Sequence, residues 1–192
     1  GTWQVLAEGC VVYGNGTATD YQKQIKVANA YGQSTLLDYS LSAKVKAVPE
    51  NGFTAGPGYF ISTRETSDVV FGPAMGYSGL AFEFKADSRS FSIYDNGTLI
   101  GSYGDGFWGE YNYSAAIDAN GYLDFRVTVV GNKITQLKLG NFTVTRIYNG
   151  TSQISLASYN LAATHPGTVS IGSHINPPSN CAGVRDFYLY PL

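Results

Sequence analysis

Charged residues are scarce in this chain of 192 residues, at 14% against the roughly 25% of a typical globular domain. The net charge is −2 and there is no basic run, which argues against nucleic acid or an anionic membrane as a partner. No stretch approaches the roughly 20 apolar residues of a membrane-spanning helix. Because the sequence also lacks an initiator methionine and a signal peptide, we expect a processed mature chain or an excised domain.

Helical periodicity is nearly absent as well, and alternation of apolar and polar residues replaces it. Tyr39–Val48 is the clearest example, with tyrosine, leucine, alanine and valine on one face and serine and lysine on the other. Asp95-Asn96-Gly97 separates two further runs, and Asn-Gly is the strongest short signal for a hairpin turn. The sequence therefore predicts short strands joined by tight turns.

About thirteen such strands, without an internal repeat or linker, predict an all-β fold. We expect a two-sheet antiparallel jelly-roll sandwich that forms a single domain over residues 1–192. The runs on which this rests are Thr2–Leu6, Cys10–Tyr13, Gln24–Ala28, Tyr39–Val48, Gly58–Arg64, Leu80–Lys85, Ser90–Tyr94, Thr98–Tyr103, Leu123–Val130, Lys133–Leu139, Asn141–Ile147, Ile154–Ser158, Thr168–Ser173 and Val184–Tyr190.

The last of these runs carries large apolar residues on both sides. Simple alternation places Val184, Asp186, Tyr188 and Tyr190 on one face, and the arginine, phenylalanine and leucine between them on the other. This pattern predicts a strand that is covered on both faces and lies well inside a sheet.

Cysteine is limited to two residues, Cys10 and Cys181. If they form a disulfide bond, the first and last strands lie side by side. Closing so long a loop would stabilise the fold by about 5 kcal/mol in the chain-entropy model. Such a bond persists in an oxidising compartment.

Potential N-glycosylation sites are more frequent than the composition predicts, with five Asn-x-Ser/Thr triplets against about two expected by chance. Export and N-glycosylation of the protein would explain this excess of triplets, and a disulfide bond would persist in the same compartment. We therefore expect a secreted or cell-surface protein. The alternative is that a surface rich in serine, threonine and asparagine forms such triplets by chance. The triplets begin at Asn15, Asn96, Asn112, Asn141 and Asn149.

The segment 104–113 resembles a ligand site more than any other stretch, because aromatic residues lie among glycines. Flat rings stack on the C–H faces of sugars, while acidic and amide groups accept hydrogen bonds from sugar hydroxyls. The alternative is that these rings pack against the sandwich edge or a neighbouring subunit. The candidate ligand-binding residues are Phe107, Trp108, Glu110, Tyr111 and Tyr113.

The order of the pieces resembles the concanavalin A-like lectin/glucanase sandwiches, including the laminin-G kind. An opening Trp3-Gln4-Val5 before a glycine-containing hairpin is similar to the start of many such domains. The other matching pieces are Tyr39–Val45, Gly79–Phe84, Phe91–Gly97, Tyr122–Val129, Gly167–Ser173 and Gly183–Tyr190. The resemblance implies a lectin-like sandwich and does not by itself imply an activity.

The resemblance also implies a structural Ca²⁺ ion, held by an aspartate of the last strand and by backbone carbonyls. Asp186 matches that position, with the turn at Glu8-Gly9 or the loop at Asn51-Gly52 as possible carbonyl donors. Asp186 could instead pair with a nearby basic side chain.

Retaining glucanases of this fold carry Glu-x-Asp-x-x-Glu on one strand, and this sequence lacks that run. Glu83, Lys85 and Asp87 share a face, which we interpret as a solvated alternation of charge. We therefore expect a non-catalytic carbohydrate-binding or cell-adhesion module whose partner is a carbohydrate or a neighbouring surface protein. The alternatives are a self-assembling subunit of an extracellular coat or filament and, after it, a glycoside hydrolase.

Overall fold

The structure, a computed structural model, describes residues 2–5, 11–14, 23–26, 37–47, 59–66, 77–85, 89–104, 113–173 and 184–192. For the first three segments it describes the backbone alone. No helix in these segments is long and apolar enough to cross a membrane.

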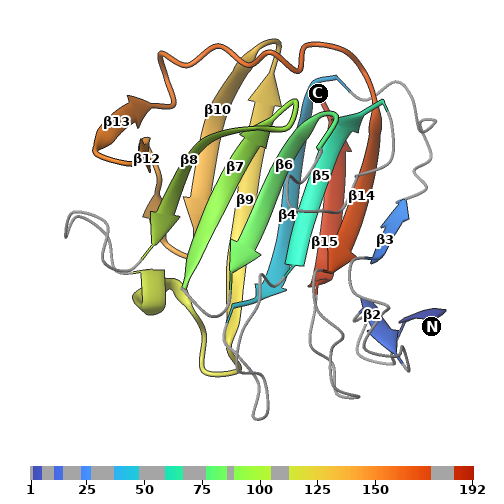
Figure 1. Ribbon diagram of the computed structural model, residues 1–192. Coiled ribbons are helices and arrows are strands. Elements are labelled where there is room, and N and C mark those ends of the chain that lie inside the picture. Colours follow the sequence, from blue (N-terminus) through green and yellow to red (C-terminus); the bar gives the residue numbers. More distant parts are fainter. Residues whose placement is uncertain are drawn as a thin grey trace.

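Two antiparallel sheets face each other and confirm the predicted all-β sandwich (Figure 1). The seven-stranded sheet has the order β1 (Thr2–Val5), β2 (Val11–Gly14), β15 (Val184–Pro191), β4 (Tyr39–Lys46), β9 (Tyr122–Val130), β10 (Lys133–Leu139) and β11 (Phe142–Thr143). The eight-stranded sheet has the order β13 (Ser152–Ser155), β12 (Arg146–Asn149), β8 (Thr98–Gly104), β7 (Ser90–Asp95), β6 (Leu80–Lys85), β5 (Tyr59–Glu65), β14 (Thr168–Ser173) and β3 (Lys23–Lys26). One turn of 3₁₀ helix, η1 (Tyr113–Ala116), precedes β9.

The hydrophobic core lies between the sheets because every second residue of a strand points the same way. In β4, Tyr39 and Leu41 are buried while the serines and lysines between the apolar residues are half-buried, as the alternation predicts. Phe125 of β9 meets Phe82 and Phe84 of β6, with ring centroids 5.1 and 5.0 Å apart. These contacts join the two sheets.

The first hairpin adjoins the last strand through β2, the arrangement that a Cys10–Cys181 bond would require. β1 and β2 form an antiparallel hairpin, and Val11 of β2 pairs with Val184 of β15. The disulfide bond between Cys10 and Cys181 lies outside the described residues and stays a prediction.

The last strand differs from the prediction because it contains a β-bulge. The pairing of β15 with β4 shifts between Arg185 and Tyr188, and Asp186 adopts a φ of 49°. One extra residue reverses the alternation, so Val184 and Leu189 both face the core while Tyr188 points outward. The strand is therefore covered on one face only, and the expectation of burial on both faces is wrong.

The predicted strand Asn141–Ile147 is also divided in the structure. Its first part, β11, pairs with β10 in the seven-stranded sheet, and its second part, β12, pairs with β8 and β13 in the eight-stranded sheet. The chain thus crosses from one sheet to the other between Thr143 and Arg146.

Tight turns close several hairpins where the sequence predicts them. Asn96 and Gly97 have φ values of 47° and 79° between β7 and β8, which suits a two-residue hairpin turn. Asn96, Asn141 and Asn149 are exposed, as a glycosylation site requires. Asn15 and Asn112 lie outside the described residues.

Candidate functional site

The outer face of the eight-stranded sheet carries mainly small and polar side chains. On β6, Phe82 and Phe84 belong to the core, so strand alternation turns Ala81, Glu83 and Lys85 outward. The hydrogen-bonded register aligns outward residues of neighbouring strands in rows. Figure 1 shows this sheet in front, with β6 between β5 and β7.

Glu83 lies near the middle of one row that crosses six strands. From β14 to β12, this row holds Gly172, Phe60, Glu83, Ser92, Ser102 and Tyr148. The next row holds Ser170, Ser62, Ala81 and Tyr94. We call these two rows, together with Lys85, the Glu83 face. Most of its residues have short side chains, and Phe60, Glu83 and Ser92 are fully buried.

Glu83 is a carboxylate withdrawn from solvent, with 0% of its side chain exposed. The Tyr94 hydroxyl donates a hydrogen bond to Glu83 Oε2 at 3.0 Å. Lys85 Nζ lies 3.5 Å from the same oxygen, and 31% of the Lys85 side chain is exposed. Burying a carboxylate costs several kcal/mol even when it is paired, so the fold gains little stability from this residue.

Three aromatic rings lie beside Glu83. Tyr77 packs edge-on against Phe60 at 5.6 Å and tilted against Tyr94 at 4.8 Å between ring centroids. The Phe60 ring lies directly over Gly172, where a side chain would collide with it. Burial raises the pKa of Tyr77, and the negative charge of Glu83 raises it further. The phenol therefore stays protonated and able to donate a hydrogen bond.

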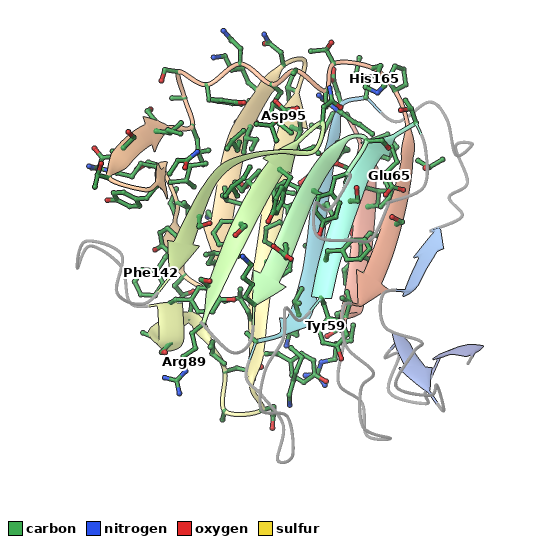
Figure 2. The ribbon with its side chains drawn as sticks, in the orientation of Figure 1. Tyr59, Glu65, Arg89, Asp95, Phe142 and His165 are labelled. Carbon is green, nitrogen blue, oxygen red and sulfur yellow. The ribbon has the colours of Figure 1, made fainter. Side chains whose placement is uncertain are left out.

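A second buried carboxylate, Glu65, lies at the end of β5. Its Oε1 accepts a hydrogen bond of 2.8 Å from the Ser170 hydroxyl. Figure 2 shows Glu65 at the upper end of β5, far from Tyr59 at the lower end. The nearby Ser62 hydroxyl is buried and has no hydrogen-bond partner in the described part of the chain.

The two glutamates come from different rows of the sheet. Ser62 is paired with Ala81, and the backbones of Glu65 and Glu83 lie on opposite sides of this pair. The Glu65 carboxylate reaches back to Ser170, in the row next to that of Glu83. The Glu83 face offers hydrogen bonds and ring faces to a ligand.

The sequence pointed to a different site. Tyr113 is 1% exposed and packs in the core, so its ring cannot form part of a sugar platform. Phe107, Trp108, Glu110 and Tyr111 lie outside the described residues.

The interpretation of Glu83 as part of a solvated face is wrong, because the residue is fully buried. In the three successive hairpin strands Leu80–Lys85, Ser90–Tyr94 and Thr98–Tyr103, Glu83 lies on the first, so the hairpins alone did not show that β5 covers its other edge. Ser92 and Ser102, on the next two strands of the same row, were the remaining signal, because a charged residue among small side chains is unusual for a packed face.

Asp186 is exposed and its carboxylate lies 3.9 Å from Arg185 Nε, as the basic-partner alternative expects. No group of three acidic, histidine or cysteine side chains that could hold a metal occurs within the described segments. Ca²⁺ takes six to eight oxygen ligands, and one carboxylate paired with an arginine does not fit that requirement. The carbonyl donors at Glu8-Gly9 and Asn51-Gly52 lie outside the described residues.

Comparison with known proteins bears on the fold. No family model and no curated protein matches the sequence. Among solved structures, the exoplasmic/lumenal domain of VIP36 in its Ca²⁺/Man3GlcNAc-bound form aligns with 100% of this chain and 83% of its own, at 13% identity and a TM-score of 0.55. Its Ca²⁺/Man2-bound form gives 12% identity and a TM-score of 0.54, over 100% of this chain and 80% of its own.

The lectin UEA-II, complexed with galactose, aligns with 98% of this chain and 89% of its own at 13% identity and a TM-score of 0.50. At these identities the likeness establishes the fold and leaves the ligand open. The laminin-G part of the resemblance has no support among these structures. Two antiparallel sheets with a shared core, together with these neighbours, establish the fold as an all-β sandwich of the concanavalin A-like kind.

Proposed function

We propose that this protein is a non-catalytic carbohydrate-binding module whose sugar site is the Glu83 face. The observation that carries the proposal is Glu83 itself, a carboxylate with no exposed side-chain area at the centre of a sheet face of small residues. A sandwich needs apolar side chains between its sheets, and it does not need a buried charge outside them.

The chemistry of the face suits a sugar. A carboxylate accepts hydrogen bonds from hydroxyl groups, and such charge-assisted bonds are stronger than neutral ones. Lys85, Tyr94 and Ser102 are partly exposed and give a ligand a path toward Glu83. The half-buried Tyr94 ring, packed against Tyr77, supplies an apolar face for sugar C–H groups. The alignment with lectins that were solved with mannose-containing sugars or galactose supports the same class of ligand.

The test is direct binding to a glycan array, followed by calorimetry with the best oligosaccharide. Glu83→Gln keeps the shape and removes the charge, so we expect at least about a tenfold loss of affinity, because hydrogen bonds to a charged group contribute about 1.5–3 kcal/mol. The variant should fold with a stability within about 1 kcal/mol of the wild type or above it, since a buried charge is removed.

Asp124→Asn is the matched control, because Asp124 is half-exposed on the other sheet and pairs with exposed Arg126. It should bind the same oligosaccharide as the wild type does. Equal affinity of wild type and Glu83→Gln would contradict the proposal.

We further propose that the protein is secreted, carries N-linked glycans and has a Cys10–Cys181 disulfide bond. The exposure of Asn96, Asn141 and Asn149 and the pairing of β2 with β15 support this. Intact-mass spectrometry of the native protein is the test. The absence of added hexose mass, together with two free thiols, would overturn it.

A further inference from the structure

The outer face of the seven-stranded sheet exposes two tyrosines. Tyr188 and Tyr190 of β15 are 53% and 56% exposed, and no other aromatic side chain of the described segments is among the exposed large hydrophobic residues. Their ring centroids lie 6.5 Å apart and their planes differ by 9°. Two parallel, solvent-facing rings on a regular strand form a ready contact surface.

The bulge at Asp186 is what turns these rings to solvent. Without the extra residue, the alternation that starts at buried Val184 would place Tyr188 and Tyr190 in the core. The neighbouring strand provides only Ser42 and Ser40 opposite the two rings. With such short side chains beside them, the rings stand free above the sheet.

The floor next to the rings is polar. The Ser40 hydroxyl lies 3.1 Å from that of Thr128 on β9, and Ser42 is paired with Arg126. Protein–protein interfaces are enriched in tyrosine and arginine but depleted in serine and lysine, so the serines and lysines of this face favour another kind of partner. Hydroxyl groups beside flat aromatic rings are instead what a polysaccharide chain requires.

The face is also basic in a chain whose net charge is −2. Asp124 and Asp186 also lie on this face, and each forms an ion pair with an arginine. Lys44 and Lys138 make no ion pair with a described residue. The outward cations, identified by strand register, are Lys44, Lys46, Arg126, Lys138 and Arg185.

We propose that this face docks an anionic polysaccharide, with sugar rings on Tyr188 and Tyr190 and carboxylate or sulfate groups near Lys44 and Arg126. Charge complementarity selects the anionic class, and the parallel rings select a chain of sugars over an isolated anion. The site lies on the opposite sheet from the Glu83 face and does not depend on it.

The test measures affinity for polygalacturonate and for its methyl-esterified, neutral form. We expect the acidic polymer to bind at least about tenfold more tightly, and raising the salt from about 0.05 M to about 0.5 M to remove most of that difference by screening. Tyr188→Ala and Tyr190→Ala should each lower the affinity by about tenfold, a typical effect of losing one stacking ring.

Lys44→Gln should lower affinity for the acidic polymer and leave the neutral polymer unaffected. Arg89→Gln on the other sheet and Leu99→Ala, an exposed apolar residue, are controls that should match the wild type. Glu83→Gln should also match it, which separates this site from the Glu83 face.

Two results would overturn the docking proposal. One is wild-type affinity in both tyrosine variants. The other is a dimer in size-exclusion chromatography with light scattering that Tyr188→Ala dissociates, because the face would then be an interface between two copies of the chain.

Discussion

At the scale of single residues, Arg64 shows how hydrogen bonds compensate the burial of a charge. Arg64 is fully buried with a φ of 54°, and its guanidinium donates to the carbonyls of Leu37 and Ala163. It also lies 3.9 Å from Asp38, which precedes β4. Arg64 thereby ties the end of β5 to the other sheet.

Tyr39 provides a prediction at this scale. Its hydroxyl lies 2.6 Å from Thr63 Oγ1, and the Thr63 proton is directed to the carbonyl of Leu80, so Tyr39 donates this bond. Burial raises the pKa of Tyr39 from 10.0 to about 12. The folded protein therefore keeps a proton that the unfolded chain loses.

The free energy of unfolding should accordingly be unaffected by this group below pH 10 and fall between pH 10 and pH 12. The loss that Tyr39 contributes is about 3 kcal/mol. Urea unfolding at several alkaline pH values measures it, and Tyr39→Phe should show a shallower decline. An identical decline in the variant would contradict the assignment.

At the scale of strands, close packing of β14 on β5 depends on a missing side chain. A Cβ atom at Gly172 would collide with the ring of Phe60, its cross-strand partner. Gly172→Ala should therefore destabilise the protein by about 1–3 kcal/mol, because the ring must leave its place beside Tyr77.

A double-mutant cycle in urea unfolding isolates this contact. In a Phe60→Ala background, Gly172→Ala should cost less than about 0.5 kcal/mol, since alanine suits a strand better than glycine does. Equal costs in the two backgrounds would show that the ring and the glycine do not interact.

Most strands were predictable from the sequence, because alternation and turn residues act locally. β6 and β14 match their predicted bounds, and the Asn96-Gly97 turn joins the expected strands. The bulge at Asp186 was not predictable, because the alternation rule assumes that each residue of a strand faces the side opposite to the residue before it. The crossing of the chain between β11 and β12 was not predictable either, because packing decides which sheet each half of the predicted strand joins.

The site was less predictable than the fold. Its members come from β5, β6, β7, β8, β12 and β14 and meet only through strand register. Glu83 looked like an ordinary surface residue because its burial depends on neighbours distant in sequence, such as Phe60.

At the scale of the whole molecule, the two sheets present outer faces of opposite character. The Glu83 face is withdrawn from solvent and centred on a carboxylate, whereas the opposite face exposes two tyrosines among basic residues. A sandwich with both faces functional could hold a sugar on one side and an acidic polymer on the other. The two activities should respond to separate substitutions.

Amide chemical-shift mapping with the oligosaccharide selected by the glycan array tests whether the sugar binds at the Glu83 face. We predict that the shifts which change on titration cluster on the outward residues of β6, β7 and β8, including Ser92, Tyr94 and Ser102, and that Glu83→Gln abolishes them. Changes confined to β4 and β15, or to residues 105–112, would contradict a sugar site at the Glu83 face.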